Sequence, residues 1–365
     1  MKNKLNIWKI LFLLFLMAGS IYIIRNNQAK VEQDKASKNW KKVDPKGNRY
    51  ASTSVDEHYI NNYGSVFGTY YSITYRSGQD MHEAIRDRLA DVDNSLSPFN
   101  KRSLITAVNE NRDTIADEMF TAVFTLAQEV SSKTSGAFDI TVAPLVNAWG
   151  FGFKNNIAVD SCTIDSIMRY VGYTGISLND GKIIKSHPET MLNCSAIAKG
   201  YGCDVIATLL TESGINDFLV EIGGEVVAKG NNPKGKNWTI GISKPIDDPT
   251  GKAQEYQTII NASGKGLATS GNYRNYRLEN GKKIAHTIDP RTGYPVTHSL
   301  LSATVIAADC ATADAYATAF MVLGVEAATQ ICKENNDIEA YFIYTDESGN
   351  LATSISEGFQ KYILK

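Results

Sequence analysis

AHTIDPRTGYPV at residues 285–296 and ATADAYATAFMVLG at residues 311–324 form the stretch around which the rest of this chain is organised. The second segment is rich in alanine and other apolar residues, which predicts a helix over Ala315–Leu323. Asp314 and Thr318 are four residues apart, so on a helix both side chains project from one face. Both can offer hard oxygen ligands to one cation, and we therefore predict a metal site here.

The first segment places polar side chains in a stiff loop. His286, Asp289, Arg291 and Thr292 fall within seven positions, and the nearby prolines and glycine favour turns over regular structure. A polar loop beside a metal-binding helix is typical of a catalytic site. Two plainer interpretations stay open: an ordinary hairpin turn at DPRTGYP, and Asp314 as a favourable charge at the start of its helix.

Composition limits the class of protein. The chain has 365 residues, of which 43% are hydrophobic, enough for a substantial core in one large domain or two small ones. A net charge of -2 and a pI near 6.2 give no basic face for a nucleic-acid partner. The five cysteines lack the spacing of a zinc site or a disulfide framework and are expected to be small buried hydrophobes.

The N-terminus reads as a targeting segment. Three lysines precede the apolar run Ile10–Ile24, which Arg25 closes, so residues 1–25 are a signal peptide or a signal anchor. No convincing A-x-A cleavage site follows, which favours an uncleaved anchor. Met17–Ser20 resembles a lipoprotein processing box, but its serine has no thiol to acylate. With the lysines in the cytoplasm, the remaining chain is expected on the outer side of the inner (cytoplasmic) membrane.

Beyond the anchor, residues 26–59 are polar and lysine-rich, which predicts a tether, and residues 60–365 then form the folded domain, with its first strand near Tyr63. Helices and strands are interleaved without a regular βαβ repeat, which predicts an α+β domain with mixed β-sheets and flanking helices. The expected helices cover residues 81–94, 117–131, from 196 onward, and 325–334. The expected strands include 65–77, a pair within 175–191, 301–307, 340–344 and 351–354, with a loop at 269–271.

Two further segments suggest a nucleotide ligand. The aromatic residues Trp149 and Phe151 alternate with Gly150 and Gly152, so they could stack on a flat heterocycle or could simply be core. Around Lys199 a strand, a turn of small residues and a helix succeed one another, and a helix N-terminus of this kind favours phosphate. The alternative is a solvated lysine on an ordinary amphipathic helix.

Eight segments occur in a characteristic order: FGTYYSITY, LSPFNKRS, FDITVAPLVNAWGFG, SAIAKGYGCD, EIGGEV, TSGNY, HTIDPRTGYP and ADAYATAFMVLG. In this order and spacing the chain resembles the ApbE-like flavin transferases, the FAD:protein FMN transferases, from Tyr63 to the C-terminus. The resemblance implies one large domain related to the T-fold that takes FAD as substrate and uses Mg²⁺. It also implies transfer of FMN to a threonine or serine hydroxyl of an acceptor redox subunit, with release of AMP.

The resemblance also implies site residues. The cation would be held by Asp314, Thr318 and the main-chain oxygen of Ala196, all oxygen donors. His286 or Asp289 is the candidate general base for the acceptor hydroxyl, a choice that the sequence leaves open. The residues expected to contact FAD are Phe67, Phe99, Trp149, Gly150, Phe151, Asn193, Lys199, His286 and Ile288.

The chain departs from the family pattern at two of these positions. Phe67 stands where methionine is common, and Asn193 stands where aspartate is usual, so one carboxylate has become neutral. The change bears on affinity for FAD and leaves the reaction class intact. Two other functions stay open: a Mg²⁺-dependent FAD pyrophosphatase that releases FMN and AMP, and a flavin-binding module without catalysis. The sequence does not identify the acceptor protein, the fate of the N-terminal segment or the oligomeric state.

Overall fold

The computed structural model places residues Asp56–Lys365 in one compact unit. The expected anchor at 1–25 and all but the last residues of the expected tether lie outside the described part of the chain. Within the described part, no helix has the length and apolar character needed to span a membrane. The structure describes residues 58–153, 160–245, 255–261, 263–272, 276–279 and 282–364.

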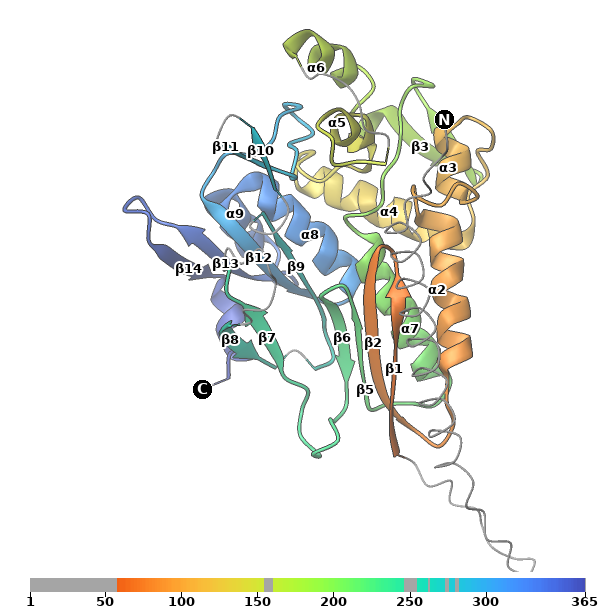
Figure 1. Cartoon of the computed structure of the whole chain (residues 1–365), viewed down its shortest axis with the longest axis vertical. Helices are drawn as coiled ribbons and strands as arrows, with labels where there is room; N and C mark the ends of the chain where they lie inside the picture. The colour runs from red at the N-terminus through yellow and green to blue at the C-terminus, as the bar shows by residue number, and fades with distance from the viewer. Residues whose placement is uncertain are drawn as a thin grey trace, which may run out of the picture. The chain divides into compact units, whose positions relative to one another are not determined.

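An eight-stranded sheet is the centre of this unit, with strand order β1-β2-β5-β6-β9-β12-β13-β14 (Figure 1). Every pairing among the described strands is antiparallel, so the α+β class is confirmed but the expectation of mixed sheets was wrong. The reason is that short turns connect several neighbouring strands, and a short turn can connect only antiparallel strands, because parallel strands require a long crossover. The strands are β1 His58–Val66, β2 Thr69–Ser77, β5 Phe218–Ile222, β6 Glu225–Lys229, β9 Gly266–Gly271, β12 Leu300–Ala307, β13 Glu339–Thr345 and β14 Leu351–Ile355.

Three separate hairpins complete the described strands. The expected pair within 175–191 is confirmed, because Asp180 and Gly181 adopt positive φ angles of 48° and 72° in a two-residue turn. The loop expected at 269–271 belongs instead to β9, which pairs with both β6 and β12. The hairpins are β3 Ile176–Asn179 with β4 Lys182–Lys185, β7 Ile240–Ser243 with β8 Tyr256–Ile260, and β10 Tyr276–Glu279 with β11 Lys282–Ala285.

The expected single strand at 65–77 is a hairpin. Val66 pairs with Thr69, and the two residues between them, Phe67 and Gly68, have left-handed φ angles of 51° and 74°. Two positive φ values in succession are the conformation of the tight turn that suits the twist of paired strands. The first described strand therefore begins at His58, ahead of the expected Tyr63, and Phe67 lies at the tip of the hairpin.

Helices α7 (Ala198–Glu212) and α8 (Cys310–Leu323) pack side by side on one face of the sheet, with α2 (His82–Leu96) against α7 and α4 (Glu118–Lys133) against α8 (Figure 1). The opposite face is covered in part by the β7–β8 hairpin and the C-terminal turn η3 (Glu357–Tyr362). Helix α8 is therefore buried between the sheet and α4, which explains why nearly its whole surface is apolar.

Helix α8 begins earlier than expected. Asp309 is its N-cap residue and accepts a hydrogen bond from the main-chain N–H of Thr312 at 2.8 Å. Asp314 thus lies in the second turn, and its interpretation as a charge at the helix start was wrong. A buried carboxylate one turn inside an apolar helix requires another explanation, because burying an ionised group is costly.

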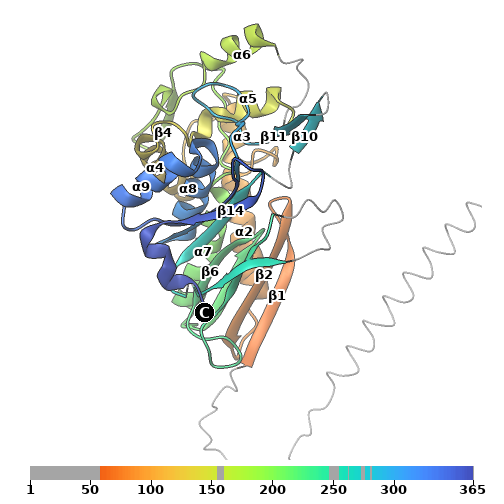
Figure 2. The same cartoon turned by 90° about the vertical axis from the view of Figure 1, so that its left-hand side faces the viewer.

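The other expected helices are present, and helix α9 has the expected bounds. Three short helices were not anticipated, because six to eight residues offer too few periodic positions to recognise. Two of them, α5 and α6, lie at the opposite end of the folded unit from the C-terminus (Figure 2). The remaining elements are α3 Leu104–Asn109, η1 Ile140–Val142, α5 Ala143–Ala148, α6 Ser161–Met168, η2 Tyr173–Gly175 and α9 Val325–Glu334.

Asp204 of α7 connects the two central helices. Its carboxylate accepts hydrogen bonds from the main-chain N–H groups of Cys310 and Ala311, at 2.9 and 2.8 Å, in the first turn of α8. Burial raises the pKa of Asp204 to about 7, and although these N–H groups lower it, the charge of Asp309 raises it further. The carboxylate satisfies donors that a helix leaves without partners at its start.

Replacing Asp204 by alanine is expected to destabilise the protein, because two buried N–H groups lose their acceptor. The expected loss in the free energy of unfolding is about 1–3 kcal/mol. Since the pKa of Asp204 is higher in the folded protein than the ordinary value of 3.8, its contribution is greatest at acid pH and declines as the pH rises to about 7. Urea unfolding of both proteins at pH 5.5 and pH 8 checks this, and an equal or larger difference at pH 8 would contradict it.

Candidate functional site

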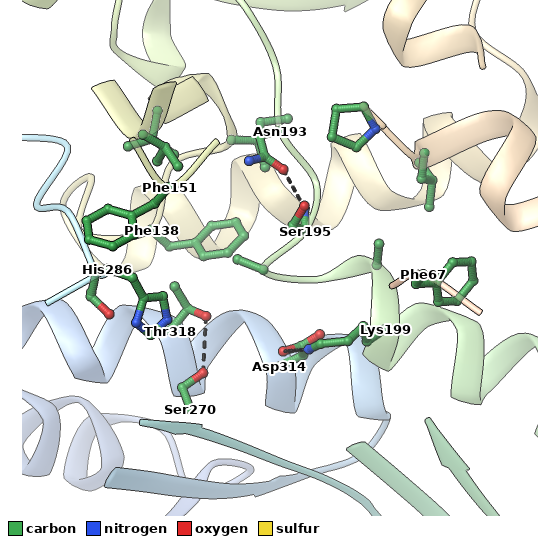
Figure 3. Close-up of a pocket in the computed structure, with 18 of the residues that line it drawn as sticks. Phe67, Phe138, Phe151, Asn193, Ser195, Lys199, Ser270, His286, Asp314 and Thr318 are labelled. Carbon is green, nitrogen blue, oxygen red and sulfur yellow. Dashed lines mark hydrogen bonds and ion pairs between the residues drawn. The ribbon is translucent and has the colours of Figure 1, made fainter. Parts of the chain in front are cut away.

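A cavity of about 970 Å³ lies where the central helices, the β1–β2 turn and the polar loop meet (Figure 3). It brings together most of the residues that the sequence singled out. Those lining the cavity are Phe67, Phe99, Phe151, Asn193, Ala196, Lys199, His286, Ile288, Asp314 and Thr318. Trp149, Gly150 and Asp289 are not among its lining residues.

Asp314 and Thr318 project from α8 into this cavity, as their spacing predicted, and Ala196 lines it from the turn before α7 (Figure 3). Asp314 is 1% exposed, and its Oδ2 accepts a hydrogen bond from the N–H of Gly200 at 3.0 Å. The Thr318 hydroxyl lies 3.3 Å from that of Ser270 at the end of β9. A carboxylate, a hydroxyl and a nearby main-chain carbonyl together match the oxygen donors that a hard divalent cation prefers.

Gly200 makes this arrangement sterically possible. A Cβ atom at this position would lie 2.3 Å from the carbonyl oxygen of Cys310 and 2.8 Å from the Cβ of Asp314. Only glycine allows α7 to approach α8 this closely, and the same approach brings its N–H to the Asp314 carboxylate. The glycine therefore determines how the two halves of the site meet.

Lys199 lies between two buried carboxylates. Its Nζ is 2.8 Å from Glu225 Oε1 and 3.6 Å from Asp314 Oδ1, and its side chain is 28% exposed. The alternative of a solvated lysine on an ordinary amphipathic helix is therefore wrong. Glu225, at the start of β6, was not identified from the sequence as a site residue. The available signal was an acidic residue directly before the apolar run of a buried strand, within EIGGEV.

The charges of this cluster shift one another's proton affinity. Burial alone would lower the pKa of Lys199, but the charges of Asp314 and Glu225 outweigh it, so that the pKa is raised and the ammonium persists. Burial raises the pKa of Glu225 to about 7, with Lys199 opposing the rise and Asp314 adding to it. The cavity thus has a strongly charged region on α7, α8 and β6.

The other end of the cavity is aromatic. The rings of Phe151 and His286 meet edge to face with centroids 6.4 Å apart. Phe138, which the sequence analysis did not identify, lines the cavity beside them (Figure 3). Phe99 is 64% exposed at the margin and meets the ring of Phe153 edge to face at 6.0 Å. Flat rings beside a charged region suit a ligand with a planar heterocycle and an anionic group.

Trp149 and Gly150 have roles outside the cavity lining. The indole Nε1 of Trp149 donates a hydrogen bond to the carbonyl oxygen of Gly293 at 2.8 Å, and its ring packs against Tyr294 with centroids 5.9 Å apart. Gly150 has a positive φ of 82°, which turns the chain so that Phe151 reaches the cavity. In this structure, then, Trp149 positions the loop and Phe151 faces the ligand space.

The two candidate general bases lie in different surroundings. His286 lines the cavity. The Asp289 carboxylate instead receives hydrogen bonds from Arg291, from Nε to Oδ1 at 2.9 Å and from Nη2 to Oδ2 at 2.8 Å. It also accepts the main-chain N–H of Arg291 at 2.9 Å, as a turn-stabilising side chain does. The geometry assigns Asp289 to loop structure and leaves His286 facing the ligand space.

Asn193 holds the turn that precedes α7. Its side-chain Oδ1 accepts a hydrogen bond from the main-chain N–H of Ser195 at 2.9 Å (Figure 3). Its main-chain N–H donates to the carbonyl oxygen of Ile140 at 2.7 Å. Both bonds are available to an asparagine as well as to an aspartate. The turn geometry around Ala196 therefore does not depend on a charge at position 193.

Within the described residues, no group of three or more His, Cys, Asp or Glu side chains could hold a metal ion. A cation in this cavity would rely on one carboxylate, supplemented by hydroxyl and main-chain oxygens. The surroundings fit such an ion, because Asp314 and Glu225 outnumber Lys199 and leave the buried cluster with an excess of negative charge.

Comparison with known proteins agrees with this geometry. The FAD:protein FMN transferase of Haemophilus influenzae is 36% identical over 317 residues, covering 82% of this chain and 90% of the relative. That of Escherichia coli K12 is 32% identical over 315 residues, covering 82% of this chain and 88% of the relative.

Solved structures give the same result. The flavin transferase ApbE from Vibrio cholerae superposes with a TM-score of 0.75 at 30% identity, covering 84% of this chain and 99% of that one. The apo flavinyl transferase ApbE of Pseudomonas stutzeri gives 0.74 at 29% identity, covering 84% and 96%. The model of the ApbE family matches residues 67–342. With its fold, its cavity and its relatives in agreement, this chain belongs to the ApbE family.

Proposed function

We propose that this protein is an FAD:protein FMN transferase, which moves FMN from FAD to a threonine or serine hydroxyl of an acceptor redox protein and releases AMP. The observation that supports this best is the single cavity with rings at one end and Lys199 beside Asp314 at the other. A molecule made of a planar flavin and a pyrophosphate matches both ends. The names of the relatives point to the same reaction.

Asp314, Thr318 and the main-chain oxygen of Ala196 would hold a magnesium ion. When bound, such an ion neutralises phosphate charge and makes phosphorus more electrophilic. The donor set supports this assignment, since all three groups offer oxygen and all three residues line one cavity. Lys199 would add a second positive charge close to the pyrophosphate, where negative charge increases during transfer.

His286 is our proposed general base. It lines the cavity next to Phe151, whereas the Asp289 carboxylate is paired with Arg291. The imidazole would take the proton of the acceptor hydroxyl as its oxygen attacks the phosphorus of the FMN half. The bond between that phosphorus and the bridging oxygen then breaks, and AMP leaves with the oxygen.

We further propose that residues 1–25 anchor the protein in the cytoplasmic membrane and that the polar segment 26–59, up to the first residues of β1, tethers the catalytic domain on its outer side. The support is the sequence alone: lysines before an apolar run, followed by a polar segment. A tether of this kind would let the domain reach membrane-associated acceptors. Cell fractionation combined with protease accessibility in intact spheroplasts tests the placement.

The central test is intact-mass analysis of an acceptor fragment incubated with FAD, Mg²⁺ and the protein. We expect a mass gain of one FMN, which EDTA abolishes. Asp314→Ala is expected to lose the gain while remaining folded, because Asp314 supplies the buried carboxylate of the proposed cation site. Glu221→Gln, on an exposed position of β5, is the matched control and should transfer normally.

Two outcomes would contradict the proposal. Splitting of FAD to free FMN and AMP across a panel of acceptors, with no adduct, would favour the pyrophosphatase. Intact FAD that binds equally well with and without Mg²⁺ would favour the flavin-binding module.

The aromatic residues allow a separate prediction. Phe151→Leu removes a ring from the cavity and is expected to weaken FAD binding by about 0.5–1.5 kcal/mol, roughly 2- to 13-fold in Kd, because the stacking contribution of the ring is lost. Trp149→Phe removes the hydrogen bond to Gly293 and should mainly lower thermal stability. Flavin fluorescence titration measures the FAD affinity of each variant, and thermal unfolding measures its stability. If Trp149→Phe weakened FAD binding while Phe151→Leu did not, Trp149 and not Phe151 would be the residue that contacts FAD.

The choice of general base can be tested in the same assay. His286→Ala is expected to lower the rate of FMN transfer about 10²- to 10⁴-fold with little change in FAD affinity, because proton transfer is lost. Asp289→Asn should reduce it far less, because its carboxylate is paired with Arg291. Single-turnover rates measured from pH 6 to 9 provide the comparison. A larger loss for the Asp289 variant would reverse the assignment.

A further inference from the structure

We propose that Glu225 is a positioning residue that holds Lys199 away from Asp314, so that the Asp314 carboxylate stays available to a divalent cation. The inference rests on the proposed cation site and adds to it a residue outside the ligand set. It is carried by three side chains from three elements: Lys199 in the first turn of α7, Asp314 in α8 and Glu225 at the start of β6.

The distances show which carboxylate holds the lysine. Nζ of Lys199 is within hydrogen-bonding range of Glu225 Oε1, at 2.8 Å, but is 3.6 Å from Asp314 Oδ1. Asp314 makes its own short contact through the other oxygen, with the N–H of Gly200. Oδ1 of Asp314 is therefore the atom for which a cation and Lys199 would compete, and Figure 3 shows the two side chains next to each other in the cavity.

Glu225 is costly for the fold. It is 3% exposed, and its Oε2 is a buried oxygen without a hydrogen-bond partner in the described part of the chain. A buried ion pair of this kind usually stabilises a protein less than apolar residues of the same size would. Oε1 makes the ion pair with Lys199, and Oε2 is the part of the carboxylate that this pairing leaves buried without compensation.

The charge balance gives the physical reason. When Glu225 is ionised, the two carboxylates and one ammonium carry one excess negative charge, which a divalent cation turns into one positive charge facing a pyrophosphate. Without the Glu225 charge, Lys199 and Asp314 would form a neutral pair in a buried site, where attraction is strong. Lys199 would then compete with the cation for Asp314.

A double-mutant cycle tests this on the full-length protein, with Mg²⁺ alone as the probe and isothermal titration as the measurement. Glu225→Gln is expected to weaken Mg²⁺ binding about 10- to 100-fold, as loss of a residue that orients a metal ligand does. Lys199→Met should bind Mg²⁺ at least as well as the wild type. The double variant should recover most of the lost affinity, because the competing ammonium is gone.

Recovery in the double variant separates positioning from damage to the fold, since a second substitution would not repair a misfolded site. Thermal unfolding in EDTA checks that each variant folds, and Glu221→Gln on β5 controls for removal of a negative charge. The inference about Glu225 would be wrong if Glu225→Gln bound Mg²⁺ as well as the wild type, or if the double variant bound it as weakly as Glu225→Gln. The proposed cation site would stand in either case. If the wild type did not bind Mg²⁺, both the cation site and the role of Glu225 would be wrong.

Discussion

The close packing of α7 against α8 is the constraint on which the rest of the site depends. At Gly200 the two helices approach so closely that even a methyl group would overlap the backbone of Cys310. This approach directs the Gly200 N–H at Asp314 and brings Lys199, one residue earlier, to the same carboxylate. Because both helices also pack on the central sheet, their positions are determined by the core and not by the ligand.

The close packing of the helices explains how the buried charges of Asp314, Lys199 and Glu225 are accommodated. Asp314 is surrounded by an apolar helix, and isolated there its charge would be strongly disfavoured. Gly200 and Lys199 compensate for part of that cost, and Glu225 adds a second buried carboxylate that pairs with Lys199. An arrangement of preorganised charges that costs stability is typical of a site built for a ligand of high charge.

The polar loop at residues 285–296 is held in place by hydrogen bonds and an ion pair, not by helix packing. Its conformation is stabilised by the hydrogen bond that Trp149 donates to Gly293 and by the pairing of two of its own residues, Asp289 and Arg291. These contacts leave His286 facing the ligand space. A loop supported in this way can hold a reactive side chain in place more accurately than a free loop could.

The sequence by itself determined the local features: the α+β class, the helix that carries Asp314 and Thr318 on one face, and the polar residues of the loop. These follow from spacing over a few residues, which the helix period converts directly into geometry. Only the tertiary structure decided that Lys199 pairs with Glu225, 26 positions later, and that Trp149 holds Gly293 across 144 positions. Contacts between distant segments depend on how the sheet and helices pack, and no local pattern encodes that packing.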